Sequence, residues 1–219
     1  MNTLAILTFL QQLQTNNDKA WMDAHRDEYQ AARESFIELV THLLRALEVE
    51  DEGLRGLDPK KCIFRLNRDI RFSKDKSPYK TNFGAALSEG GRKSGNASYY
   101  LHLQPNDESF IGGGLYQPPS DALAKVRQEI DYNASELQKI VLSPDFKATF
   151  GEIQGDALRR APKGYAPDHP NIALLKLKDY IVLRKLTDDE VTDEQFPDWA
   201  LAMFKTMVPF VHYLNVAVS

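Results

Sequence analysis

The segment YKTNFGAALSEGGRKSGNASYYLHLQPNDESFIGGGL, residues 79–115, contains three runs in which successive side chains alternate in character. The runs cover residues 79–87, 97–104 and 109–115; in the first two, one face takes mainly apolar side chains at every second position, and the third continues the series after a short turn. A period of two is that of an extended strand, whose side chains point to opposite faces in turn. Parallel neighbours would need crossovers of a dozen or more residues, so the short polar turns between the runs predict an antiparallel meander.

Helical patterns lie on both sides of this segment. Residues 36–47 repeat apolar side chains at the spacing of one buried helix stripe, and residues 3–14 form a shorter amphipathic pattern. Residues 179–186 are predicted to add a strand, and a C-terminal helix follows that Pro209 is expected to kink or break. The pattern predicts one α+β domain spanning residues 1–219, with an antiparallel sheet of three to five or more strands packed with N-terminal and C-terminal helices.

Composition limits the class of protein. The 219 residues are 42% hydrophobic and 26% charged, with a net charge of −4, as in ordinary soluble domains. No window approaches the roughly 20 continuous apolar residues that a membrane span needs. Cys62 is the only cysteine, which excludes an internal disulfide and leads us to expect a reducing compartment, the cytoplasm.

Positive charge is concentrated in residues 60–80. This window holds eight basic side chains and two aspartates, a net charge of +6, so the remainder of the chain sums to −10. The basic residues are Lys60, Lys61, Arg65, Arg68, Arg71, Lys74, Lys76 and Lys80. Cations gathered on one surface repel one another unless something negative binds there. The charge density therefore favours an anion site in the basic segment, which we define as residues 62–82.

The residue types in the basic segment suit an anion. Arginine presents a planar fork that grips carboxylate or phosphate with two hydrogen bonds, and hydroxyl and amide groups add neutral donors. The predicted ligand-binding residues of the segment are Arg65, Asn67, Arg68, Arg71, Lys76, Tyr79 and Lys80. The alternative is a solvated loop whose charge balances acidic residues elsewhere, such as the run 188–198 with its six acids and no bases.

Other residues are candidates for the rest of the same pocket. Successive glycine N–H groups can form an anion nest, and three basic residues, Arg159, Arg160 and Lys163, lie in the polar loop 155–170. These further ligand-binding candidates are Gly112, Gly113, Gly114, Arg159 and Lys163. His102 and Tyr100 share one strand face and are the candidates for proton transfer, while a hydrogen-bonded surface histidine is the favoured interpretation of His102. The histidine spacing predicts no metal site, and no cofactor is predicted.

Six blocks of the chain, in order, resemble an uncharacterised bacterial family, domain of unknown function 2461. The blocks are NNDKAWMDAHRDEY, CIFRLNRDIRFSKDKSPYKTNFGA, YYLHLQP, FIGGGLYQPPS, LAKVRQEIDYN and LRRAPKGYAPDHP. The resemblance runs from about residue 4 to residue 216, and its longest block is the basic segment. It implies a single cytosolic domain. It implies no reaction, and it carries no catalytic residue over to this chain.

Three functions therefore stay open, and the sequence does not say whether the protein is an enzyme. The first is binding, with or without catalysis, of a phosphorylated or carboxylated small molecule through residues 62–82. The second is a protein-interaction module, whose partner includes the acidic run 188–198 of a second copy in a homo-oligomer. The third is nucleic-acid binding, with aromatic residues between the arginines of the segment, which the negative net charge disfavours. No membrane partner is expected.

Overall fold

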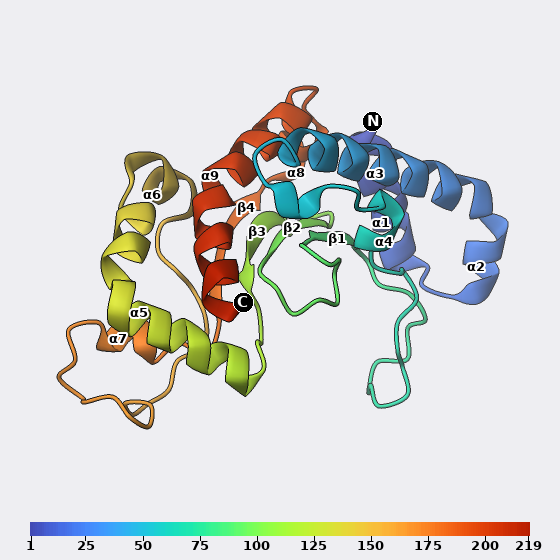
Figure 1. The fold of residues 1–219 in the computed structure, drawn as a ribbon. Helices are drawn as coiled ribbons and strands as arrows, with labels where there is room; N and C mark the ends of the chain where they lie inside the picture. Colours follow the sequence, from blue (N-terminus) through green and yellow to red (C-terminus); the bar gives the residue numbers. More distant parts are fainter.

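The computed structural model describes residues 1–219 and has an α+β fold, as predicted (Figure 1). The helices are α1 (Thr3–Thr15), α2 (Lys19–Ala24), α3 (Arg26–Leu47), the 3-10 helix η1 (Glu52–Leu54), α4 (Pro59–Cys62), α5 (Ser120–Val141), α6 (Pro144–Phe150), α7 (Ile172–Leu175), α8 (Asp188–Thr192) and α9 (Phe196–Val218). The strands are β1 (Phe83–Leu87), β2 (Ser98–Leu103), β3 (Ser109–Leu115) and β4 (Tyr180–Leu186).

The four strands form one antiparallel sheet in the order β1-β2-β3-β4. The predicted meander is confirmed, and the predicted strand at residues 179–186 joins it as β4 beside β3. The first strand is shorter than its alternating pattern suggested. It begins at Phe83, because residues 79–82 leave the sheet and Tyr79 bridges instead to Asn67 in the basic segment.

One face of the sheet is covered by α3 and α9 (Figure 1). Phe36 of α3 stacks on Phe83 of β1 with ring centroids 5.3 Å apart, and Phe204 of α9 packs edge-on against Tyr99 of β2 at 5.7 Å. All four side chains are buried. They belong to one continuous cluster of 45 buried residues that runs from α1 to α9 and ties both terminal helices to the sheet.

Helix α9 lies very close to β3. A Cβ atom at Gly113 would sit 2.3 Å from Met207 Sδ and 2.4 Å from the Ser98 carbonyl oxygen, so only glycine allows this approach. Of the kink or break expected at Pro209, the break does not occur, because α9 is continuous from Phe196 to Val218 and its buried side chains lie on both sides of the proline. By length and composition α9 could cross a membrane, but a buried core helix passes the same test.

The basic segment forms a hairpin-like excursion between α4 and β1 that projects away from the body of the protein (Figure 1). Its two arms pair through backbone hydrogen bonds, from Arg68 N to the Pro78 carbonyl at 2.9 Å and from Lys80 N to the Leu66 carbonyl at 2.8 Å. Its base is fixed by Asn17, whose amide side chain exchanges two hydrogen bonds with the backbone of Tyr79. We call residues 69–77 the hairpin tip.

Candidate functional site

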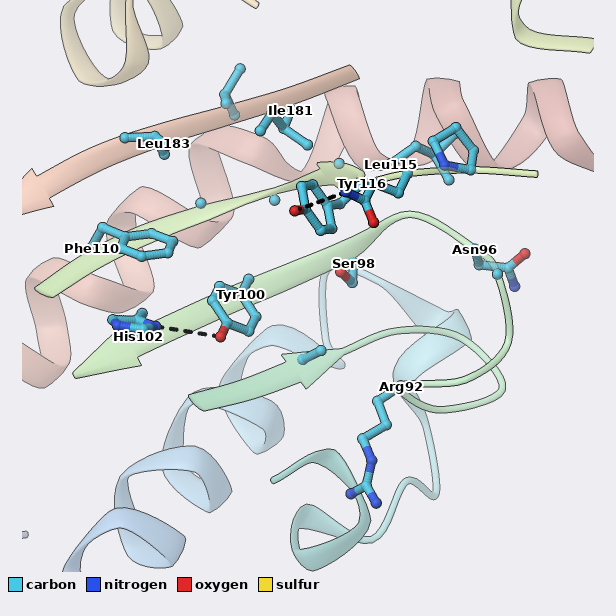
Figure 2. Close-up of a pocket in the computed structure, with 18 of the residues that line it drawn as sticks. Arg92, Asn96, Ser98, Tyr100, His102, Phe110, Leu115, Tyr116, Ile181 and Leu183 are labelled. Carbon is cyan, nitrogen blue, oxygen red and sulfur yellow. Dashed lines mark hydrogen bonds between the residues drawn. The ribbon is translucent and has the colours of Figure 1, made fainter. Parts of the chain in front are cut away.

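The face of the sheet that α3 and α9 leave uncovered carries a cavity of about 700 Å³. All four strands contribute to its floor, and its walls come from Phe64, the β1–β2 turn and the segment after β3. Figure 2 shows these side chains on the side of the strands away from the helices. The labelled residues are Arg92, Asn96, Ser98, Tyr100, His102, Phe110, Leu115, Tyr116, Ile181 and Leu183.

Small residues make the hollow in this face. Ala86, Ser98, Gly112 and Gly114 line it from β1, β2 and β3, so little side chain rises from the middle of the sheet. The predicted glycines at 112–114 therefore reach the cavity, but their role here is to leave space and to let strands and α9 pack closely. This matches the alternative of close packing that the sequence left open beside an anion nest.

An aromatic group forms one end of the cavity. The rings of His102 and Phe110 stack with centroids 4.6 Å apart, and Tyr100 lies 5.6 Å from Phe110 and 6.1 Å from Phe64. The Tyr100 hydroxyl reaches across β1 because position 84 is glycine: a Cβ atom there would lie 2.7 Å from that hydroxyl. Flat apolar groups of a ligand could pack on these rings.

Hydrogen bonds hold His102 in place within this group. Its Nε2 lies 3.0 Å from Gln104 Oε1, and the Gln104 amide nitrogen in turn donates to the Glu108 carboxylate. Its Nδ1 lies 3.4 Å from both the Tyr100 hydroxyl and the Asn82 amide nitrogen. Burial lowers the pKa of His102 below its usual value, against the opposing effects of Gln104 and Glu108, so the ring is neutral at pH 7. Burial also raises the pKa of Tyr100, which keeps its proton.

Arg92 is the one permanently charged residue among those that line the cavity, which include no aspartate or glutamate. Its guanidinium donates to the carbonyl oxygens of Lys61, at 2.7 Å, and Ile63, at 2.5 Å. It also lies over the Phe64 ring, 5.5 Å from the centroid. The backbone of the basic segment therefore fixes this arginine at the cavity wall.

Lys80 of the basic segment packs on the same ring as Arg92, and the exposed Arg65 is close enough to Lys80 for its charge to act on it. Lys80 Nζ lies 5.6 Å from the centroid of the same Phe64 ring. The pKa of Lys80 is lowered, first by burial and then by the positive charges of Arg65 and Arg92. None of these three cations forms an ion pair with a carboxylate in the chain. We call Arg65, Lys80 and Arg92 the cation cluster; of the three, only Arg92 lines the cavity itself.

The predicted cations of the hairpin tip and its upper arm have partners of their own. Arg68 pairs with Asp75, and Arg71 binds Asp69 through two guanidinium nitrogens at 2.7 and 2.9 Å. Lys76 Nζ donates to a backbone carbonyl of the tip at 3.0 Å. None of these residues lines the cavity, and the tip aspartates already neutralise Arg68 and Arg71, so the tip offers no unpaired arginine to a ligand there.

The remaining predicted residues are distributed between the hairpin base and a distant loop. Asn67 and Tyr79 bridge the two arms of the hairpin and do not line the cavity. Arg159 and Lys163 are exposed in the loop between α6 and α7, which lies on the opposite side of the molecule from the hairpin (Figure 1). They therefore do not form the far wall of the cavity, because that wall is built from the segment after β3 and from β4.

The acidic run 188–198 does not dock on the basic segment. Asp188 accepts hydrogen bonds from the backbone of Asn106 and Asp107, and Glu190 pairs with Arg184 at 2.6 Å. The acidic side chains of the run accept hydrogen bonds from the backbone of the β2–β3 turn and form the capping box at the start of α8. The intramolecular balance that the sequence offered as an alternative is thus absent from the structure.

Sequence reasoning missed Arg92, Phe64, Phe110 and Gln104. Arg92 lies in a glycine-rich turn that we interpreted only as a connection between strands. The alternation of the third strand gave a signal for Phe110. It lies between the buried Ser109 and Ile111 and pairs with His102, so its side chain must point to the same face of the sheet as those of Tyr100 and His102. No group of three or more histidine, cysteine, aspartate or glutamate side chains is arranged to hold a metal ion.

Comparison with known proteins places the chain in one family. The family described as conserved hypothetical protein (DUF2461) matches residues 5–213, so the chain belongs to it, in agreement with the resemblance found in the sequence blocks. No curated protein and no solved structure matches the chain.

Proposed function

We propose that this member of the DUF2461 family binds a small molecule with an anionic group and a flat apolar part in the cavity on the open face of its sheet. The anionic group, a phosphate or carboxylate, lies against the cation cluster. The apolar part lies over the aromatic end of the cavity. One observation carries the proposal: Arg92 lines a cavity that has no carboxylate, Lys80 packs on the same Phe64 ring as Arg92, and neither cation has an ion-pair partner.

The electrostatics of the cation cluster support an anion. Burial first, and then the charges of Arg65 and Arg92, lower the pKa of Lys80, so its ammonium group bears a desolvation cost and a repulsion that a bound anion would offset. The tip cations differ, since Arg68 and Arg71 are neutralised by aspartates of the same hairpin. Within the basic segment, the anion site therefore lies at the base of the hairpin and not at its tip.

The dimensions and lining of the cavity support the apolar part of the ligand. Its volume of about 700 Å³ lies within the range of small-molecule sites, roughly 300–1,000 Å³. Apolar surface dominates its lining, with Ile181 and Leu183 of β4 on one side and Phe64 on the other. A purely ionic ligand would leave most of this surface unused, so an aromatic phosphate or carboxylate fits the cavity better than inorganic phosphate does.

A thermal-shift titration with phenyl phosphate tests the proposal. At a ligand concentration of 100 times Kd, binding to the folded state stabilises it by about 2.7 kcal/mol. For a chain of this size that corresponds to a rise in Tm of about 5 to 11 °C. Inorganic phosphate should bind at least about tenfold more weakly than phenyl phosphate because it does not contact the rings. Equal affinity for the two would contradict the assigned position of the apolar part.

Two lysine variants separate a specific site from general attraction to a basic surface. Lys80→Gln removes a cation of the cluster, and loss of one charge-assisted hydrogen bond of about 1.5–3 kcal/mol should weaken phenyl phosphate binding at least about tenfold. Lys74→Gln makes the same change at an exposed position of the hairpin tip and should alter Kd less than about twofold. If both variants weaken binding equally, or neither does, the cation cluster is not the site.

We also propose a cytoplasmic location for the protein. Cys62 is buried and unpaired, and burial raises the pKa of its thiol, so it acts as a small apolar core residue that needs no oxidising environment. Fractionation of cells that express the tagged chain tests this location. Recovery of the chain in a membrane or extracellular fraction would contradict it.

A second candidate function, binding of an acidic protein partner, rests on the hairpin tip. Phe72 is 96% exposed there, and the Arg71 guanidinium lies 5.9 Å from its ring centroid. Exposed aromatic and arginine side chains together are common at protein interfaces. A second copy of the chain is the first partner to test, by light scattering of the wild type and of Phe72→Ser. A monomer in both cases at micromolar concentration would exclude self-association through the tip.

A further inference from the structure

The hydrogen bonds around His102 determine which ring nitrogen carries the proton. An ionised carboxylate can only accept, so the Gln104 group that faces Glu108 is its NH₂. The amide oxygen of Gln104 therefore faces His102 Nε2, 3.0 Å away, and an amide oxygen can only accept. The hydrogen of the neutral ring consequently lies on Nε2, and Nδ1 carries a free electron pair.

The surroundings of Nδ1 combine a base with hydrogen-bond donors. The Tyr100 hydroxyl and the Asn82 amide nitrogen both lie 3.4 Å from it, at the long end of hydrogen-bonding distance, so neither uses the electron pair fully. Both are neutral donors at pH 7, since burial raises the pKa of Tyr100. Lys80 Nζ lies 5.6 Å from the centroid of the Phe64 ring, which in turn lies 6.1 Å from the Tyr100 ring. A ligand held by Lys80 would thus find one base and two donors next to its anionic group.

We propose that the protein catalyses enolisation, with His102 Nδ1 as the general base that removes a proton from a carbon between a carbonyl group and the apolar part of the bound anion. The substrate class is a carboxylate or phosphate with a carbonyl group and an adjacent C–H bond. This proposal rests on the proposed binding function, because Lys80 and its neighbours must first hold the anion.

The proton transfer is balanced without any co-reactant. The C–H bond breaks, its electron pair stays on the substrate as an enolate, and a new N–H bond forms at Nδ1. His102 becomes an imidazolium ion whose Nε2–H still donates to Gln104. The Tyr100 hydroxyl and the Asn82 amide donate to the enolate oxygen and stabilise the negative charge that develops there. Return of the proton to carbon or to the enolate oxygen restores neutral His102.

Phenylpyruvate is a suitable probe, because it joins an aromatic ring, an acidic methylene group and a 2-oxo carboxylate. In D₂O, catalysis should appear in proton NMR spectra as loss of the methylene signal faster than in buffer alone. A general base contributes about 10²–10⁴-fold to such a step, so His102→Gln should lower the protein-dependent rate at least about 100-fold. His169→Gln, which changes a histidine that pairs with Asp131 outside the cavity, should leave the rate unchanged.

A ligand without an exchangeable C–H bond distinguishes failure of this proposal from failure of the binding function. Phenylglyoxylate has the ring, carbonyl group and carboxylate but no proton to lose. If it binds and phenylpyruvate shows no protein-dependent exchange, or if His102→Gln retains exchange, the general base is refuted and the binding site stands. If phenylglyoxylate does not bind to the wild type, both proposals fail for 2-oxo carboxylates.

The tautomer gives a second test that needs no substrate. Long-range ¹H–¹⁵N NMR spectra should show His102 protonated on Nε2 alone at pH 7. Gln104→Leu removes the acceptor, so we expect a mixture of tautomers and a lower exchange rate with an altered pH profile. Gln104 is a positioning residue in this scheme. A proton on Nδ1 in the wild type, or an imidazolium ion at pH 7, would overturn the assignment of His102 as the base.

Discussion

Replacement of Tyr99 by phenylalanine should destabilise the protein by removing one buried hydrogen bond. Tyr99 is fully buried on the helix-covered face of β2, and its hydroxyl donates to Asp51 Oδ2 at 2.8 Å. A hydrogen bond to a charged group contributes about 1.5–3 kcal/mol. Asp51 is only half-buried and also accepts from the Gly53 backbone at 3.0 Å, so water can reach the carboxylate that loses its partner. We therefore expect the lower end of the range, about 1.5 kcal/mol, and a fall in Tm of about 3 to 6 °C.

Tyr213→Phe provides the matched control. The Tyr213 hydroxyl is buried and has no hydrogen-bond partner, so its removal relieves a desolvated polar group. Denaturant unfolding followed by circular dichroism should show this variant to be as stable as the wild type or up to about 1 kcal/mol more stable. The denaturant slope should be unchanged in both variants. An equal loss of stability in both, or none in Tyr99→Phe, would refute the assigned role of the bond to Asp51.

Two further predictions concern the cavity. Gly84→Ala places a Cβ atom 2.7 Å from the Tyr100 hydroxyl. The substitution should lower the free energy of unfolding by about 1–3 kcal/mol in the wild type and by much less in a Tyr100→Phe background. A double-mutant cycle of unfolding free energies measures this difference. Phenyl phosphate binding should weaken from pH 8 to pH 10.5. The pKa of Lys80 is lowered from 10.5, so as pH rises the free protein loses the Lys80 proton before an ordinary lysine would, and binding must take that proton up again. Calorimetric Kd values that stay constant over that interval, or that fall as pH rises, would contradict the second prediction.

The strands and the C-terminal helix were predictable because each has a local signal. In β2 the burial of the side chains alternates with the same period of two as the sequence. Tyr99, Leu101 and Leu103 are buried, and the residues between them are half-buried. Pro209 shows where a local rule fails. Proline removes one backbone donor, but the buried side chains before and after it fix the direction of α9, and tertiary packing outweighs the local cost.

The site was only partly predictable, because the density of charged residues along the sequence does not reveal where each side chain points in the folded protein. The basic segment returns on itself, so Arg68 and Asp75, seven residues apart, meet and neutralise each other at the tip. Lys80 lies on the returning arm and reaches the sheet, where Arg92 from a different turn joins it. Arg65 and Lys80 were among the predicted residues, but nothing local separates them from Arg71.

The two faces of the sheet explain why the cavity and the candidate base occur together. A strand residue must face either the helices or the open side, and the face with α3 and α9 takes the large apolar side chains. The open face is then free to carry glycine, alanine and serine at its centre and polar or aromatic groups at one end. Tyr100 and His102 of β2 and Gln104 just after it alternate on this open face, which brings donor, base and positioning amide into one row. A shift of one residue in the register of β2 would bury all three against α9, so the same pairing that closes the core also holds the proposed chemistry on the solvent side.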